Sequence, residues 1–258
     1  MKKLSGKTAL VTGAESGIGQ AIAIEFAKEG ANVVIVYFKD QENAEETLQQ
    51  VEQTGQKGLV LYADVSDEQS VAQLFEQAYQ QYQTLDILVN DAGVNGSGTT
   101  VADMDTATFD RTIKTNLYGP FFCCRAFLKH RLQQGGKGKI VNISSIHEEV
   151  VSAGTADYCA SKGGLRNLMR TLALEVAEQG INVNNIAPGM ILTPMNQKAI
   201  DDPKDREQKE QKIPMKRAGE PQEIAKVAVF LASADADYVT GSTYAMDGGL
   251  MRMVAQGA

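Results

Sequence analysis

Short apolar runs alternate along this chain with longer segments of helical periodicity, and this alternation most constrains how the chain can fold. In the first half the runs are Thr8–Thr12, Val33–Val36, Leu59–Leu61 and Leu85–Asn90, which are rich in apolar and β-branched residues. Strands that alternate with helices form a parallel sheet with helices on both faces, joined by right-handed crossovers. The sequence therefore predicts a doubly wound α/β fold.

The second half continues the alternation. A helical stretch covers about 106–133, a strand follows at Lys139–Ile143, a helix begins near Asp157, and two more strands cover Ile181–Val183 and Ser242–Met246. These runs bring the sheet to about seven strands, as in a Rossmann-type fold. Because no linker or internal repeat interrupts the chain, we expect a single domain over residues 1–258.

A polar excursion over about 195–220 departs from the alternation. Its core, Ile200–Lys212, is the most polar segment of the chain. Two interpretations stay open: a solvated surface helix, or a mobile lid over the active site, since the excursion closely follows a loop that could bind a cofactor.

Composition disfavours several functions. Acidic residues outnumber basic ones by 32 to 25, and the formal net charge of −7 opposes binding to nucleic acid or anionic membranes. Three cysteines, at positions 123, 124 and 159, give neither a disulfide framework nor metal-ligand spacing, and two histidines exclude a histidine-rich zinc site. No apolar run approaches the roughly 20 residues that span a bilayer, and the N-terminus lacks the apolar core of a signal peptide. We expect a cytoplasmic protein with a small-molecule substrate and no metal.

The turn between the first strand and the first helix, Thr12–Gly19, contains three glycines. Gly13 permits a tight turn, Gly17 lets the backbone approach a diphosphate, and Gly19 permits close contact between helix and strand. The N-terminus of the following helix offers free N–H groups to phosphate. A plain turn would also explain the glycines, but their place in the first βαβ unit favours dinucleotide binding.

Tyr158 and Lys162 stand one helical turn apart, so their side chains share one face of a predicted helix. An unperturbed tyrosine has a pKa of about 10, and a nearby ammonium lowers this pKa, which makes the tyrosine a usable proton donor and acceptor. Ser145 ends the preceding strand at the same edge of the sheet, where it could hold a substrate oxygen. Asn116 lies inside the long helical stretch, where an asparagine often only faces solvent.

Together and in this order, these residues resemble the classical short-chain dehydrogenase/reductase family over almost the whole chain. The resemblance implies an NAD(P)-dependent oxidoreductase that transfers a hydride between the nicotinamide and a secondary alcohol or carbonyl. It implies that Tyr158 is the general acid/base, that Lys162 lowers the pKa of Tyr158 and binds the nicotinamide ribose, and that Ser145 positions the reacting oxygen. Asn116 would hold a water of a proton relay.

The resemblance also implies the cofactor contacts. Besides Tyr158 and Lys162, they come from the glycine loop, the strand ends and a second cofactor loop: Gly13, Ser16, Gly17, Ile18, Gly19, Tyr37, Asp64, Val65, Asn90, Ala92, Gly93, Pro188, Gly189, Ile191 and Thr193. One departure is Asp91, where the family usually has a second asparagine. It adds a carboxylate beside the cofactor.

The choice between NAD and NADP depends on the end of the second strand, where NAD-binding folds commonly carry an acid. That position is Tyr37, so no carboxylate repels a 2′-phosphate, and Lys39 could reach such a phosphate. Against this, Ser16 replaces a basic residue of many NADP enzymes, and Glu15 adds negative charge. We expect use of both cofactors, with at most a slight preference for NADP.

Within the family, the segments Asn142–Glu148 and Asn182–Asn185 are similar to bacterial glucose 1-dehydrogenases, which implies a sugar or polyol substrate such as glucose. We expect His147 to face the substrate pocket and bind a hydroxyl, the alternative being a histidine packed in a loop. Glu148 and Glu149 are interpreted as solvated loop charges.

Two other functions stay open. One is a ketone or 3-oxoacyl reductase of the same family, although residues 94–105 lack the basic side chains that an acyl carrier usually needs. The other is a cofactor-binding regulator without turnover, which the intact Tyr158 and Lys162 disfavour. The family usually associates through elements matching Pro221–Leu231 and Ser242–Met246, so the resemblance implies a homotetramer, with the tail Met251–Ala258 against a neighbouring subunit.

Overall fold

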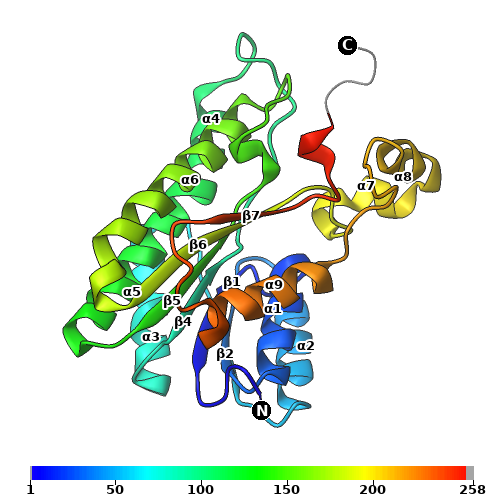
Figure 1. The fold of residues 1–258 in the computed structure, drawn as a ribbon. Coiled ribbons are helices and arrows are strands. Elements are labelled where there is room, and N and C mark those ends of the chain that lie inside the picture. Colours follow the sequence, from blue (N-terminus) through cyan, green and yellow to red (C-terminus); the bar gives the residue numbers. More distant parts are fainter. Residues whose placement is uncertain (1, 254–258) are drawn as a thin grey trace.

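Seven parallel strands form one sheet in the computed structural model, which describes residues 2–253 (Figure 1). The strands are β1 (Thr8–Thr12), β2 (Asn32–Tyr37), β3 (Gly58–Tyr62), β4 (Ile87–Asn90), β5 (Gly138–Ile143), β6 (Ile181–Pro188) and β7 (Thr243–Met246). Their spatial order is β3-β2-β1-β4-β5-β6-β7, so the order reverses between β1 and β4. Open α/β sheets bind ligands in the crevice at such a switch point.

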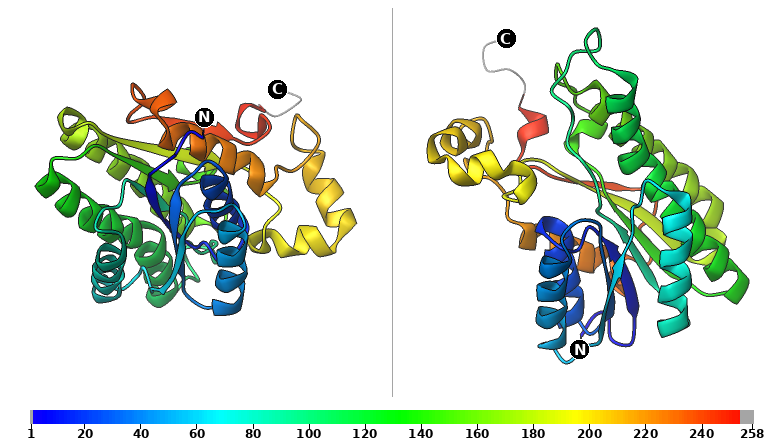
Figure 2. Two further views of the ribbon diagram at one scale, coloured as in Figure 1. Left: turned by 90° about the horizontal axis from the view of Figure 1, so that it is seen from below. Right: turned by 180° about the vertical axis from the view of Figure 1, so that it is seen from behind.

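The longer helices are α1 (Gly17–Lys28), α2 (Gln41–Glu52), α3 (Glu68–Tyr82), α4 (Thr106–Ile113), α5 (Gly119–Gln134), α6 (Ala156–Val176), α7 (Gln197–Asp201), α8 (Pro203–Glu210) and α9 (Pro221–Ala232). Shorter helical turns are η1 (Lys114–Tyr118), η2 (Ile146–Glu148), η3 (Ala177–Gln179), η4 (Pro194–Asn196), η5 (Ala234–Ala236) and η6 (Leu250–Arg252). Helices α1, α2 and α9 cover one face of the sheet, and α3, α5 and α6 cover the other (Figures 1 and 2). The predicted doubly wound fold is confirmed.

Strand β2 shows why both faces are covered. Val33 and Ile35 pack into the core beneath α1 and α9, whereas Val34 and Val36 pack into the core that includes α3 and α5. Successive side chains of a strand point to opposite faces, so an unbroken run of β-branched residues suits a strand buried on both sides. The parallel strands then end at one common edge, and this edge carries the candidate site.

Two elements differ from the prediction. The helical stretch expected over about 106–133 is divided into α4, a π-helical turn η1 and α5. Such π-helical turns are rare in proteins, and those that occur are often found at functional sites. Strand β6 extends well beyond the expected 181–183. Its polar side chains are satisfied there, because the amides of Asn182 and Asn184 donate to the Val239 carbonyl at 3.0 and 2.8 Å.

The polar excursion forms α7 and α8, which stand apart from the layers of the sheet (Figure 2). Helix α8 contributes no buried residue, as expected for a surface helix, and the role of this segment as a lid stays a prediction. Within residues 2–253, no helix has both the length and the apolarity needed to cross a bilayer. Residues 254–258 of the tail that was predicted to contact a neighbouring subunit lie outside the described residues.

Candidate active site

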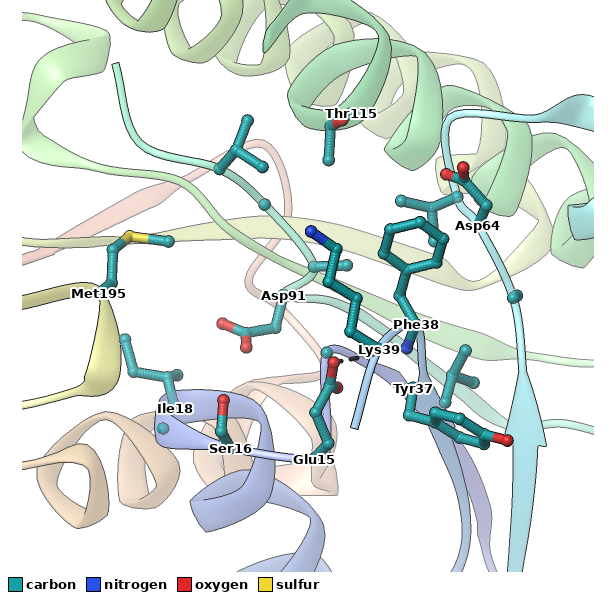
Figure 3. Close-up of a pocket in the computed structure, with 18 of the residues that line it drawn as sticks. Glu15, Ser16, Ile18, Tyr37, Phe38, Lys39, Asp64, Asp91, Thr115 and Met195 are labelled. Carbon is teal, nitrogen blue, oxygen red and sulfur yellow. Dashed lines mark hydrogen bonds between the residues drawn. The ribbon is translucent and has the colours of Figure 1, made fainter. Parts of the chain in front are cut away.

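Two adjoining cavities open at the carboxyl edge of the sheet. The larger, of about 520 Å³, lies between the loop after β1 and the ends of β2, β3 and β4 (Figure 3). Its lining includes most of the predicted cofactor residues: Gly13, Ser16, Gly17, Ile18, Tyr37, Asp64, Val65, Ala92, Gly93 and Thr193. The smaller, of about 80 Å³, is lined by the remaining ones, Tyr158, Lys162, Pro188, Gly189 and Ile191, together with Ser145. Only Gly19 and Asn90 of the predicted set line neither cavity.

The glycine loop forms a cradle that side chains would fill. The backbone φ is +70° at Gly13 and +56° at Gly17, a left-handed conformation that favours glycine. A Cβ on Gly13 would lie 3.0 Å from the backbone of Ala92, and one on Gly19 would overlap the Gly13 carbonyl oxygen. Gly19 therefore allows the close packing predicted for it. The cradle stands at the N-terminus of α1, which has no side-chain cap, so the loop fits the diphosphate of a dinucleotide.

Asn90 begins a ladder of buried amides across the sheet. Its Nδ2 donates to Asn142 Oδ1 on β5 at 2.8 Å, and Asn142 Nδ2 donates to Asn185 Oδ1 on β6 at 3.0 Å. The Asn185 amide donates in turn to the Glu148 carboxylate at 3.2 Å. The side chain of Asn90 is thus turned into the sheet, where it joins β4 to β5, instead of facing the cofactor cavity.

Glu148 is not the solvated loop charge that the sequence suggested, since its side chain is only 1% exposed. Its Oε1 lies 3.4 Å from Arg166 Nε on α6, and Arg166 also pairs with Glu149, which is exposed as expected. A buried carboxylate needs such partners to offset its lost hydration. The sequence carried no signal for this burial, because the turn η2 has no regular period and its partners lie far along the chain.

Ser145, Tyr158 and Lys162 converge on the smaller cavity. Ser145 follows β5, and its Oγ accepts a hydrogen bond from the His147 backbone N–H at 3.2 Å. Lys162 Nζ donates to the Ile143 carbonyl at 3.0 Å and lies 5.7 Å from the centre of the Tyr158 ring. The strand end and the helical spacing therefore bring the three predicted residues together.

Burial shifts the proton affinities of this site in opposite directions. It raises the pKa of Tyr158, although a hydrogen bond with Ser145 opposes the change. It lowers the pKa of Lys162 to about 8, against the attraction of the Asp91 and Glu148 carboxylates. Both groups therefore favour their neutral forms more than in water, and a positive charge in the cavity would favour ionised tyrosine.

The π-helical turn η1 brings Asn116 into the interior, where a solvent-facing side chain was one expectation. Asn116 is fully buried, its Oδ1 accepts from the Val94 N–H at 2.8 Å, and its Nδ2 donates to the Val94 carbonyl at 2.9 Å. The same Nδ2 lies 3.3 Å from Ser161 Oγ on α6. Asn116 thus joins the loop after β4 to the helix that carries Tyr158 and Lys162.

His147 lies beside the catalytic cavity without lining it. Its Nδ1 is 3.0 Å from the Val150 carbonyl, and its ring meets the Tyr158 ring edge-on with 5.8 Å between centroids. A carbonyl can only accept a hydrogen bond, so in the neutral imidazole Nδ1 carries the proton and Nε2 is an acceptor. The structure thus shows a histidine packed in its loop and in contact with Tyr158.

The outer part of the larger cavity carries the aromatic side chains of Tyr37 and Phe38, and Tyr62 packs against them from outside the lining. The Tyr62 ring lies 5.8 Å from Tyr37 and 6.0 Å from Phe38, while Lys39 extends over the cavity (Figure 3). The Phe38 N–H donates to the Glu15 carboxylate at 3.4 Å, and burial raises the pKa of Glu15.

The lining of the larger cavity also includes residues for which the sequence predicted no role, among them Phe38, Arg111, Thr115 and Met195. Arg111 and Thr115 are four positions apart, a spacing that could have indicated a shared face toward the cavity. No comparable local signal exists for Phe38, which lies in a bend after β2, or for Met195, which lies in the short turn η4.

Comparisons with known proteins extend over the whole of this architecture. A family model described as enoyl-(acyl carrier protein) reductase matches residues 13–251. Glucose 1-dehydrogenase 2 of Bacillus subtilis is 42% identical over 96% of this chain and 96% of its own length. The 3β-hydroxysteroid dehydrogenase 1 of Eggerthella lenta is also 42% identical, over 96% of this chain and 94% of its own.

One of the similar solved structures contains a bound cofactor. A protein of Agrobacterium tumefaciens, provisionally named a 2-deoxy-D-gluconate 3-dehydrogenase and crystallised with bound NADP, matches with a TM-score of 0.89. It is 37% identical, and the match covers 97% of this chain and 98% of that one. With the glycine cradle and the convergence of Ser145, Tyr158 and Lys162, these matches lead to one conclusion: the chain belongs to the short-chain dehydrogenase/reductase family and is an NAD(P)-dependent oxidoreductase.

Proposed function

We propose that this enzyme oxidises a secondary alcohol of a sugar or polyol, with glucose as the first candidate. The observation that carries the proposal is the 3.0 Å contact of His147 Nδ1 with the Val150 carbonyl, which leaves Nε2 as an acceptor on a ring that meets the Tyr158 ring edge-on. A substrate with several hydroxyls could donate one of them to this nitrogen while another reacts. The relatives named for glucose and for 2-deoxy-D-gluconate support the same substrate class.

We assign the proton transfer to Tyr158. In the direction of oxidation its phenol oxygen takes the proton of the substrate hydroxyl, while Ser145 Oγ donates a hydrogen bond to the same oxygen. We assign to Lys162 the stabilisation of the ionised tyrosine, since its Nζ lies 5.7 Å from the centre of the ring and is held by the Ile143 carbonyl. When bound, the nicotinamide supplies the position that accepts or donates the hydride. We assign Asn116 to a proton relay that leads through a water to solvent.

The cofactor would be held by the predicted residues that line the two cavities, with the diphosphate in the cradle of Gly13 and Gly17. We propose that both NAD and NADP bind, with a slight preference for NADP. Tyr37 places no carboxylate at the end of β2, and the ammonium of Lys39 extends over the cavity there (Figure 3). The NADP in the Agrobacterium structure supports this preference.

We also propose that residues 1–258 act as one catalytic domain that assembles as a homotetramer. Helix α9 and strand β7 match the elements through which the resemblance implies association. Light scattering that shows a monomer would remove this proposal. A location in the cytoplasm stays a prediction.

An absorbance assay for reduced nicotinamide tests the function. It pairs NAD and NADP with glucose, other aldoses, polyols and a 3β-hydroxysteroid, and it runs small ketones in the reverse direction. Turnover with sugars or polyols supports the proposal. Turnover confined to ketones or to a 3-oxoacyl substrate would replace it with the reductase alternative, and cofactor binding without any turnover would favour a regulator.

A further inference from the structure

Asp91 stands at the junction of the two cavities. Among the described residues, those that line both cavities are Ile18, Asp91, Gly93, Val94, Thr193 and Met195. Asp91 is the only acidic one in this set. A dinucleotide that reaches from the adenosine end to Tyr158 must pass this junction. The carboxyl group of Asp91 therefore lies beside the path of the cofactor. At this position the family usually has an asparagine.

The surrounding backbone fixes the carboxyl group in place. The Asp91 N–H donates to Thr12 Oγ1 at 3.1 Å, and its Oδ2 lies 2.7 Å from the position that a Cβ would take on Gly19. Asp91 thus points toward the start of α1, on the Ile18 side of the glycine loop (Figure 3). The N-terminus of α1 is also where the loop fits a diphosphate, so two anions would share one helix end.

Three other titratable groups face Asp91. Lys162 from α6 attracts its carboxylate, Glu15 from the glycine loop repels it, and Tyr158 from α6 is a neutral neighbour. Burial raises the pKa of Asp91 to about 7, although Lys162 and the Gly19 N–H act in the opposite direction. Burial therefore favours the protonated form of this group over what an exposed aspartate would show.

A bound cofactor changes this balance. Its diphosphate brings two negative charges to the helix end, and like charges in a poorly solvated site disfavour the ionised carboxyl. We propose that Asp91 is a cofactor-binding residue that acts as an uncharged carboxylic acid, so that the dinucleotide binds together with one proton. This rests on the proposed position of the cofactor. The acid then donates a hydrogen bond toward the cofactor where an ionised carboxylate would repel it.

Infrared difference spectroscopy of NADPH binding identifies the group. At pH 8 we expect bound minus free protein to gain the C=O stretch of a protonated carboxyl and to lose carboxylate bands. The Asp91→Asn variant, which carries the usual residue of the family, should bind NADPH without this change. The Glu15→Gln variant is the matched control and should retain it. A band that persists in Asp91→Asn, or its absence from the natural protein, would overturn the proposal.

Calorimetry in buffers of different ionisation enthalpy measures the proton itself. With a free pKa of about 7, uptake should rise from about half a proton at pH 7 toward one at pH 8, and the Kd for NADPH should increase about fivefold over that interval. Binding without proton uptake at pH 8 would refute the role of Asp91 and leave the cofactor site intact. No binding of NADPH or NADH at any pH would instead refute the site.

Discussion

The two ends of the cofactor groove are built differently. At the catalytic end, Ser145 and Lys162 are 7% and 5% exposed and are held by hydrogen bonds to the loop and strand around them. At the end that we propose for the adenosine, Phe38 and the neighbouring Tyr62 are 42% and 54% exposed, and their rings are tilted toward one another with 6.0 Å between centroids. The proposed reacting groups are thus held by hydrogen bonds with the backbone, whereas the side chains that we propose near the adenosine are exposed. We expect substitutions at the catalytic end to have large effects on kcat or on the free energy of unfolding. Substitutions at the other end should change only the preference between NADPH and NADH.

The largest effect should follow from Tyr158→Phe. This change removes only the phenol oxygen, and a positioned acid/base contributes about 10²–10⁴-fold to rate, so kcat should fall by about 10³-fold. The Kd for NADPH, measured by fluorescence titration, should stay within about twofold because the ring remains. A variant that keeps more than a tenth of the natural kcat would show that another group moves the proton.

The buried acid at the catalytic end gives the next largest effect. Glu148→Ala should lower the free energy of unfolding by about 3 kcal/mol, because it leaves the amide of Asn185 and part of Arg166 without a partner. Glu149→Ala removes the exposed partner of the same arginine and should cost no more than about 1 kcal/mol. Denaturant unfolding at one fixed protein concentration compares the two. Equal losses would show that the burial of Glu148 has no energetic consequence.

The contrast between the two ends also explains what the sequence could predict. The glycine cradle, the strand ends and the pair Tyr158–Lys162 are local patterns, in which spacing within a few residues determines which side chains meet. The same holds for β2, whose unbroken apolar run indicates burial on both faces.

The features that escaped prediction depend on partners far along the chain. The direction of the Asn90 amide is set by Asn142 on the next strand, and the burial of Glu148 by Asn185 and Arg166. Asn116 reaches the interior because a π turn interrupts the helix, and helical periodicity contains no signal for such a turn. Nonlocal hydrogen bonds of this kind become visible only when the strands are paired.

At the adenosine end, Lys39→Ala should weaken NADPH binding about three- to tenfold and leave NADH binding nearly unchanged. A partly exposed ammonium that meets a phosphate contributes about 1 kcal/mol, since solvent screens it. Lys57→Ala, an exposed lysine that precedes β3 at the opposite edge of the sheet, is the control. Equal losses for both cofactors would show that Lys39 does not contact the 2′-phosphate.

The smallest effect should follow from substitution of His147. This substitution distinguishes a role in substrate binding from a role in packing against Tyr158. If Nε2 accepts a hydrogen bond from a substrate hydroxyl, His147→Ala should raise the KM for glucose about two- to tenfold, because such a bond contributes about 0.5–1.5 kcal/mol. A simple secondary alcohol with no second hydroxyl should be turned over with unchanged KM, and His147→Gln should restore part of the loss through its amide oxygen. His130→Ala, the other histidine of the chain, serves as the control on α5. If kcat falls equally for both substrates, His147 acts by packing against Tyr158, and the specificity for polyols must reside elsewhere in the cavity.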